Sequence, residues 1–138
     1  MKTRMLRDIE VSEIGMGCMA FSHGYGQIPD EQYSIEAIQN AFEHGCTFFD
    51  TAEVYSPGLE GIGHNERIVG KALKDVRDQV VIATKLFLRV GPGGSVYKTI
   101  RSHLEASMAR LQTDRVDLYY LHRMGGVPVE KVAEAIVL

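Results

Sequence analysis

The sequence predicts an α/β protein in which parallel strands are joined by helical crossovers. Short apolar, β-prone runs alternate with amphipathic helical segments along the whole chain. None of these runs shows the apolar–polar alternation of a strand with one solvated face, so the sheet is expected to be covered on both faces. No linker or low-complexity tract divides the 138 residues, and one domain over 1–138 is expected.

The composition is typical of a globular enzyme and argues against several other classes. Apolar residues make up 45% of the chain, charged residues 24%, and the formal net charge is −3. With no Lys/Arg run, there is no electrostatic case for nucleic acid. We find no signal peptide and no apolar run of bilayer length, so no membrane role is expected. Two cysteines, interpreted as buried free thiols, suit a reducing compartment, and we expect a cytoplasmic protein.

The N-terminal third contains the first two predicted strands. Residues 1–15 read as a short hairpin that leads into a strand over 14–20. Asp30 is the expected N-cap of a helix, and Gly45 is expected to end it. The apolar run 46–49 then predicts a buried strand that ends at Asp50.

The middle of the chain predicts a second and a third strand–helix unit. Asn65 is the expected cap of a helix, and 80–84 is the clearest strand of the sequence. The Gly-Pro-Gly-Gly segment within 90–95 matches no phosphate-binding motif and is interpreted as a turn. The apolar stripe of the next helix is Ile100, Leu104, Met108 and Leu111.

The last unit is a strand over 116–121 followed by a helix that begins at Pro128. The residues expected on its apolar face are Val129, Val132, Ala133 and Ile136. Four strand–helix units are half of a (β/α)8 TIM barrel, which typically needs about 250 residues. Because the last helix reaches Leu138 without a cap, we expect a truncated N-terminal portion of one barrel domain. Two open sheet edges would then favour poor stability or self-association.

Three ionisable side chains occupy the same kind of position. Asp50, Lys85 and His122 each follow the last apolar residue of a predicted strand, and Tyr55 lies in the loop after the second strand. The carboxyl ends of parallel strands in a barrel share one face, where active sites lie. The sequence therefore predicts that these four groups converge.

Such a set can move a proton to a carbonyl oxygen. An ammonium held by a carboxylate and placed beside a phenol stabilises the phenolate, which makes the phenol a stronger proton donor. The imidazole of His122 can hydrogen-bond the same oxygen. None of these groups supplies electrons, so the hydride must come from a cofactor.

Five segments resemble motifs of the aldo-keto reductase family, in the family's order. Asp50–Tyr55 resembles D-T-A-x-x-Y, and Asn65–Leu73 resembles N-E-x-x-[LVI]-G-x-A-L. Val81–Lys85 and Leu111–His122 are similar to the strands that end in the family's catalytic Lys and His. Gly15–Met19 resembles the first strand and turn under the nicotinamide, in a form closer to the bacterial and channel-subunit-like branch.

The resemblance implies a TIM barrel with an N-terminal hairpin that reduces aldehydes or ketones to alcohols. It implies hydride transfer from NADPH, with NADH as the other donor, and no metal. Tyr55 would be the acid, Lys85 and Asp50 its tuning pair, and His122 the carbonyl-orienting group. The implied cofactor contacts are Gly17, Cys18, Met19 and Asp50. The implied substrate contacts are Tyr55, His122, Phe21, Phe87 and Arg123.

Two alternatives remain beside the reductase. One is a truncated, non-catalytic half barrel, and the other is a cofactor-binding regulatory subunit. The segment Ser56–Gly58 departs from the family, which often has Gly directly after the Tyr. The remaining histidines lack metal-ligand spacing and are expected at the surface or at helix caps: His23, His44, His64 and His103.

Overall fold

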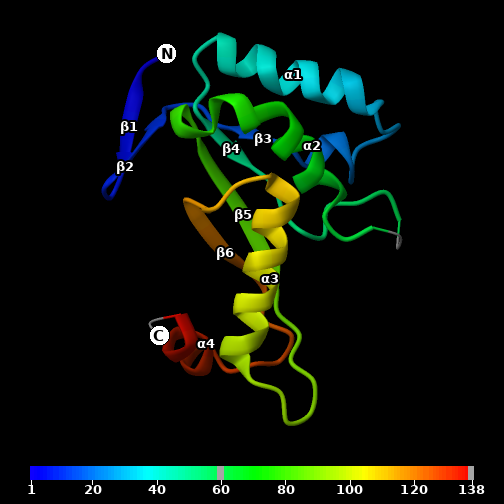
Figure 1. Cartoon of the computed structure of the whole chain (residues 1–138), viewed down its shortest axis with the longest axis vertical. Coiled ribbons are helices and arrows are strands. Elements are labelled where there is room, and N and C mark those ends of the chain that lie inside the picture. Colours follow the sequence, from blue (N-terminus) through cyan, green and yellow to red (C-terminus); the bar gives the residue numbers. More distant parts are fainter. Residues whose placement is uncertain (59–60, 137–138) are drawn as a thin grey trace.

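The computed structural model describes residues 1–58 and 61–136 of the chain, which form alternating strands and helices (Figure 1). The strands are β1 (Thr3–Leu6), β2 (Ile9–Ser12), β3 (Met16–Gly17), β4 (Phe48–Asp50), β5 (Val81–Phe87) and β6 (Leu118–Arg123). The α-helices are α1 (Glu31–Glu43), α2 (His64–Leu73), α3 (Val96–Leu111) and α4 (Val129–Ile136). Two 3-10 helices, η1 (Met19–Phe21) and η2 (Lys74–Gln79), complete the described elements.

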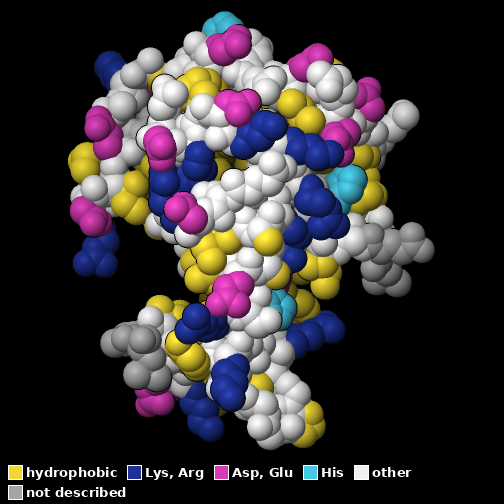
Figure 2. Space-filling model, in the orientation of Figure 1, with side chains coloured by type: hydrophobic (Ala, Val, Ile, Leu, Met, Phe, Trp, Pro, Cys, Tyr) yellow, Lys and Arg dark blue, Asp and Glu magenta, His cyan; other side chains and the backbone are white. Residues whose placement is uncertain are grey.

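The sheet is parallel and its strands follow chain order. β1 and β2 form a separate antiparallel hairpin, and the four-stranded sheet has the order β3-β4-β5-β6. The helices contact one another in the same succession, α1 with α2, α2 with α3 and α3 with α4. The helices α1, α2 and α3 are thus crossovers between neighbouring parallel strands, and α4 follows β6, which confirms the predicted α/β class. On the face seen in Figure 2, charged side chains of both signs cover the α1 and α2 region, and hydrophobic side chains gather around β6 and α3.

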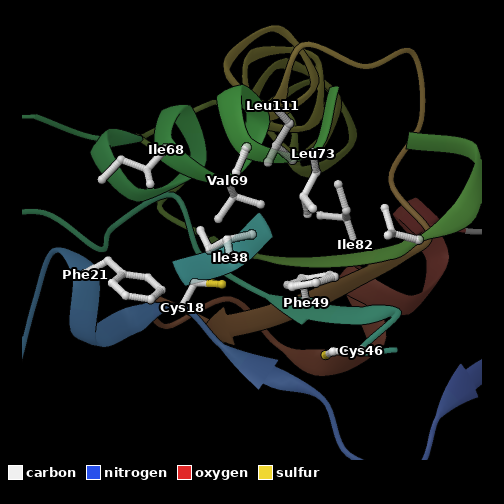
Figure 3. Packing of buried hydrophobic residues seen from close by; sticks show 12 residues of the cluster. Cys18, Phe21, Ile38, Cys46, Phe49, Ile68, Val69, Leu73, Ile82 and Leu111 are labelled. Atoms are coloured by element: carbon white, nitrogen blue, oxygen red, sulfur yellow. The ribbon is translucent and has the colours of Figure 1, made fainter. Parts of the chain in front are cut away.

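The core lies between the sheet and the helices. Ile38 of α1, Leu73 of α2 and Leu111 of α3 pack on Phe49 of β4 and Ile82 of β5 (Figure 3). A second cluster joins the far end of β5 to α3 and α4, through Leu86, Leu88, Ile100, Val132 and Ala135. In β5, Ile82, Thr84 and Leu86 are buried on the helix side of the sheet. Because strand side chains alternate between faces, Ala83 and Lys85 point away from the helices.

Two predicted strands are shorter or displaced. The predicted strand over 14–20 is reduced to β3, because Cys18 turns into helical backbone and η1 follows. The Cys18 amide instead donates to the Asp50 carbonyl at 2.8 Å. The strand predicted over 46–49 corresponds to β4, which begins two residues later than predicted. The Cys46 amide still donates to the carbonyl of Ala41 in α1 at 3.0 Å and so does not pair with a strand.

The two later strands run beyond the predicted ends. β5 and β6 remain paired up to Phe87 and Arg123, with a register shift between Leu86 and Phe87. Lys85 and His122 therefore lie inside their strands, not after them. A bulge of this kind redirects the side chains that follow it, and here it lies next to the converging polar groups.

Two helix details differ from the prediction. Asn65 is not a cap: Gly63 precedes α2, and Asn65 lies fully buried in its first turn. On α4, Val129 and Ile136 are exposed, and Val132 and Ala135 form the buried face. In so short a helix the apolar residues are compatible with two different buried faces. Packing against α3 determines which of these faces is buried. The Asp30 cap is confirmed by the 2.8 Å bond that its carboxylate accepts from Tyr33 N.

Within the described ranges, no helix has both the length and the apolar character needed to traverse a lipid bilayer.

Candidate active site

Lys85 is the centre of the polar cluster on the face of the sheet away from the helices. Its ammonium donates to the Asp50 carboxylate, to the Thr51 carbonyl at 2.9 Å and to the Tyr55 hydroxyl at 3.1 Å. The side chains of Lys85 and Asp50 are 16% and 34% exposed, so the ion pair is partly shielded from water. An ammonium has three donors, and all three are used here. Tyr55 therefore accepts from Lys85, which leaves its own proton free for another acceptor.

Tyr55 is carried by a loop that is anchored at both sides. Its amide donates to Ala52 O at 3.3 Å, and its carbonyl accepts from Asn65 N at 3.2 Å. The Asn65 side chain in turn donates to Cys18 O at 2.8 Å and accepts from Thr51 Oγ1 at 2.6 Å. The segment after β3, the loop after β4 and the start of α2 are thus joined through one buried amide.

His122 presents its ring edge-on to Tyr55. The ring centroids are 5.7 Å apart and the ring planes meet at 85°. Burial lowers the pKa of His122 below its ordinary value, and the charges of Lys85 and Arg123 lower it further. The ring is consequently neutral at pH 7. Its buried Nδ1 has no hydrogen-bond partner among the described residues.

A cavity of about 380 Å³ opens over the Tyr55 and His122 rings. The described residues that line it are Met19, His23, Val54, Tyr55, Phe87, His122 and Arg123. The cavity combines apolar walls with a phenol and an imidazole, and is large enough for a small organic molecule. The arrangement can bind a carbonyl group and deliver a proton to its oxygen.

The sequence-predicted residues fall into three groups. Asp50, Tyr55, Lys85 and His122 come together, and Met19, Phe87 and Arg123 line the cavity beside them. Gly17 is exposed next to Asp50, its partner in the β3–β4 register. Cys18 is fully buried, and burial raises the pKa of its thiol, so its side chain belongs to the core.

Phe21 was expected among the substrate contacts, and the structure places it elsewhere. Its ring packs in the core cluster near Cys18 and is absent from the described lining of the cavity (Figure 3). The physical reason is the turn of η1. It buries the large apolar ring and leaves the neighbouring Met19 facing the cavity.

Glu53 is a structural residue that the sequence did not reveal. Its carboxylate, 3% exposed, accepts from Phe87 N at 2.7 Å and pairs with His103 Nδ1 at 2.8 Å. Arg110 lies 3.9 Å away and bonds Glu66 at 2.5 Å. His103, expected at the surface or at a cap, is 34% exposed and has this additional contact with a buried carboxylate. Glu53 lies in a loop, where hydrophobic periodicity gives no information. The sequence therefore could not predict its contacts with Phe87 and His103.

His23 was also expected at the surface or at a cap, and it has a more specific place. Its ring stacks on Tyr55, with centroids 6.3 Å apart and planes 9° from parallel, and Nδ1 lies 3.3 Å from Ser56 O. Tyr55 thus stands between two imidazoles. His44 bonds Asn40 O at 2.8 Å at the end of α1, which confirms the capping expectation for that residue.

Comparison with known proteins assigns the family. The model of the aldo/keto reductase family matches residues 13–137, which is nearly the whole chain. The chain therefore belongs to the aldo/keto reductase family. Its strands and helices correspond to a portion of the TIM barrel of that family.

Individual relatives support this assignment. The chain is 41% identical over 129 residues to probable aldo-keto reductase 1 of Glycine max, covering 88% of this chain and 36% of that protein. It is 40% identical over 134 residues to the aldo-keto reductase YhdN of Bacillus subtilis, covering 91% and 39%. The latter match supports the bacterial branch.

A solved structure shows the same arrangement. The aldo-keto reductase of Klebsiella pneumoniae in complex with NADPH superposes with a TM-score of 0.77 and 30% identity, covering 99% of this chain and 45% of that one. The chain thus spans less than half the length of each of these three proteins.

Proposed function

We propose that this chain serves the reduction of aldehydes or ketones to alcohols, with hydride from NADPH (or NADH) and a proton from Tyr55. The observation that carries the proposal is the hydrogen bond of 3.1 Å from Lys85 Nζ to the Tyr55 hydroxyl, at the floor of the cavity that His122 also lines. A phenol that accepts from an ammonium loses its proton more readily, because the charge stabilises the phenolate.

The proton path follows from the donors in place. Lys85 donates its three hydrogen bonds to Asp50, Thr51 and Tyr55. The Tyr55 hydroxyl proton is therefore available to an oxygen atom that occupies the cavity. His122, neutral at pH 7, supplies a second hydrogen bond to that oxygen and fixes the carbonyl beside the phenol. As the oxygen gains charge, Tyr55 donates its proton and the phenolate left behind is held by the Lys85 ammonium.

The residues around Asp50 suit a nicotinamide cofactor, and Gly17 and Asp50 line a cavity of their own, separate from the one over Tyr55. A Cβ added to Gly17 would meet nothing within 4 Å, so a flat ring can approach the backbone there, next to Asp50. Gly17, Met19 and Asp50 would hold the group, and it would supply the hydride that no side chain of this site can provide. The NADPH complex of the Klebsiella pneumoniae relative supports this choice of cofactor. Free thiols at Cys18 and Cys46 agree with the proposed cytoplasmic location.

The test is NADPH-dependent reduction of 4-nitrobenzaldehyde by residues 1–138, followed by NADPH absorbance, in wild type and Tyr55→Phe. Loss of the proton donor is expected to lower kcat at least 100-fold with near-normal NADPH binding. Tyr25→Phe is the matched control, because Tyr25 is 72% exposed and lies outside the cavity lining. Equal turnover of wild type and Tyr55→Phe would refute the role of Tyr55.

A second candidate function is a cofactor-binding, non-catalytic unit that assembles with another copy. The observation in its favour is that β3 and β6 end the described sheet and have one unpaired edge each. Tyr120 of β6 is also 44% exposed. Unpaired parallel edges are templates for pairing with a second chain.

Light scattering combined with the assay separates the two candidates. A dimer that binds NADPH without reducing aldehydes would favour the non-catalytic unit. Turnover lost in Tyr55→Phe and kept in Tyr25→Phe would favour the reductase, whatever the oligomeric state. A sharply melting monomer would contradict self-association.

A further inference from the structure

Two arginines flank the cavity over Tyr55 without a carboxylate partner. Arg123 lines the cavity, and the guanidinium carbon of Arg89 lies 4.5 Å from the centroid of the Phe87 ring, another wall of the same cavity. Neither arginine forms an ion pair within the part of the chain that the structure describes. Arg110, by contrast, is paired with Glu53 and Glu66.

The local carboxylates are already engaged. Asp50 holds Lys85, and Glu53 accepts from Phe87 N and His103 beneath the cavity. No acidic side chain is found among the described residues of the lining. The positive charge beside the cavity is therefore not compensated by a carboxylate. A concave site focuses the electric field, so a ligand in the cavity experiences a positive potential.

The backbone holds Arg123 in place. The register shift between β5 and β6 pairs Phe87 with Arg123, and Leu88 N donates to Arg123 O at 2.9 Å. The irregularity falls at His122, so the strict alternation of faces is broken there, and Arg123 lines the same cavity as the His122 imidazole. The charge of Arg123 reaches that imidazole, whose pKa it helps to lower.

We infer that the cavity takes carbonyl compounds that carry an anionic group, a carboxylate or a phosphate, and that Arg123 pairs with that group. For the carbonyl group of the substrate the inference rests on the proposed function, and it adds that the opposite end of the substrate is anionic. Arg123 binds the anion, and Arg89, stacked on the Phe87 ring, adds to the attraction. The carbonyl then lies toward Tyr55 and His122. A guanidinium is well matched to this task, because its planar donors fit a carboxylate or phosphate in pairs.

The test compares two probes of equal shape, 4-(hydroxymethyl)benzoate and the neutral 4-(hydroxymethyl)benzamide, by calorimetry on residues 1–138. The benzoate is expected to bind about tenfold more tightly, the size of one charge-assisted hydrogen bond. Arg123→Met is expected to abolish this preference and to leave benzamide binding within about twofold. Arg123→Lys should retain part of it, because the charge remains and the paired donors do not.

Arg101→Met is the matched control, because Arg101 is exposed and paired with Glu105 on α3. It is expected to keep the full preference for the benzoate. Equal affinity of wild type for both probes, no binding of either probe, or an unchanged preference in Arg123→Met would overturn the inference. The cofactor phosphates are the other source of anionic groups. If Arg123→Met weakens NADPH binding and spares the benzoate, the arginine serves the cofactor and the inference is wrong.

These outcomes are independent of turnover. Tyr55→Phe should keep the probe preference, so a chain that prefers the benzoate but reduces no aldehyde would refute the proposed function alone. A chain that reduces aldehydes through Tyr55 without distinguishing the probes would refute only the anion site.

Discussion

At the scale of single residues, the distribution of protons within the site is the central feature. Lys85 has three acceptors for three protons, and Tyr55 is one of them. His122 is neutral and has a buried nitrogen without a partner in the described part of the chain. An unsatisfied buried polar atom carries a cost in folding free energy, and such atoms concentrate at sites that bind a ligand.

This state of His122 predicts a pH dependence of stability. Its pKa is lower in the folded chain than the ordinary value of about 6.5, so the unfolded chain binds the proton more readily. The contribution of His122 to stability is therefore fully present above about pH 6.5 and decreases as the pH falls below it. Urea midpoints at pH 7.5 and 5.5 should show a smaller loss in His122→Gln than in wild type. The same loss in both proteins would contradict the assignment.

At the scale of secondary structure elements, one buried charge network joins the Tyr55 loop to its neighbours. Glu53 links this loop to β5 through Phe87 and to α3 through His103. Glu66 of α2 accepts from Thr84 at 2.6 Å and from Arg110 at 2.5 Å. The elements around the cavity thus share polar contacts as well as the apolar core, and their relative positions depend on both.

The network predicts a large effect of losing its central charge. Glu53→Ala leaves the Phe87 amide and the half-buried His103 without their acceptor, while Arg110 keeps Glu66, and should cost about 1–3 kcal/mol of unfolding free energy. Glu105→Ala removes an exposed partner of Arg101 and should cost under about 1 kcal/mol. Urea denaturation followed by circular dichroism measures both. Similar losses for the two variants would show that the Glu53 contacts contribute little.

Gly70 sets how closely α2 approaches α3. A Cβ at this position would lie 2.7 Å from the Leu111 carbonyl carbon and 2.8 Å from Arg110 O. These are backbone atoms, so Gly70→Ala should force the helices apart and cost about 1–3 kcal/mol in spite of alanine's better helix propensity. Gly91→Ala, where nothing lies within 4 Å, should leave the melting temperature nearly unchanged. Comparable melting of both variants would contradict the close contact.

At the scale of the whole molecule, the described sheet ends in β3 and β6, each of which has one unpaired edge. The apolar surface around β6 and α3 in Figure 2 adjoins one of these edges. Burying apolar surface and pairing backbone groups are both favourable, so association is the expected way for the chain to gain stability.

Association predicts a concentration-dependent melting temperature. Because a dimer is stabilised by mass action, raising the chain concentration from about 1 to 100 µM should raise Tm by several degrees. Differential scanning calorimetry across this range gives the result. A constant Tm would contradict self-association, and the light-scattering mass from the same samples provides the cross-check.

The sequence by itself determined the α/β class, the four strand–helix units and the identity of the polar cluster. Apolar runs and helical stripes such as that of α3 are local signals, and they survive tertiary packing. Asp50, Tyr55, Lys85 and His122 were recognisable because strand ends in a parallel sheet share an edge and because their motifs are specific.

Tertiary structure alone decided the details between elements. It displaced the strand boundaries, moved Phe21 into the core, buried Asn65 and brought His23, Glu53 and His103 to the Tyr55 loop. These positions depend on contacts between segments far apart in the chain: Glu53 meets His103 across 50 residues. Periodicity describes which face of an element is apolar. It does not describe which distant group will meet a given polar side chain, because that partner is chosen by packing and charge in the folded molecule.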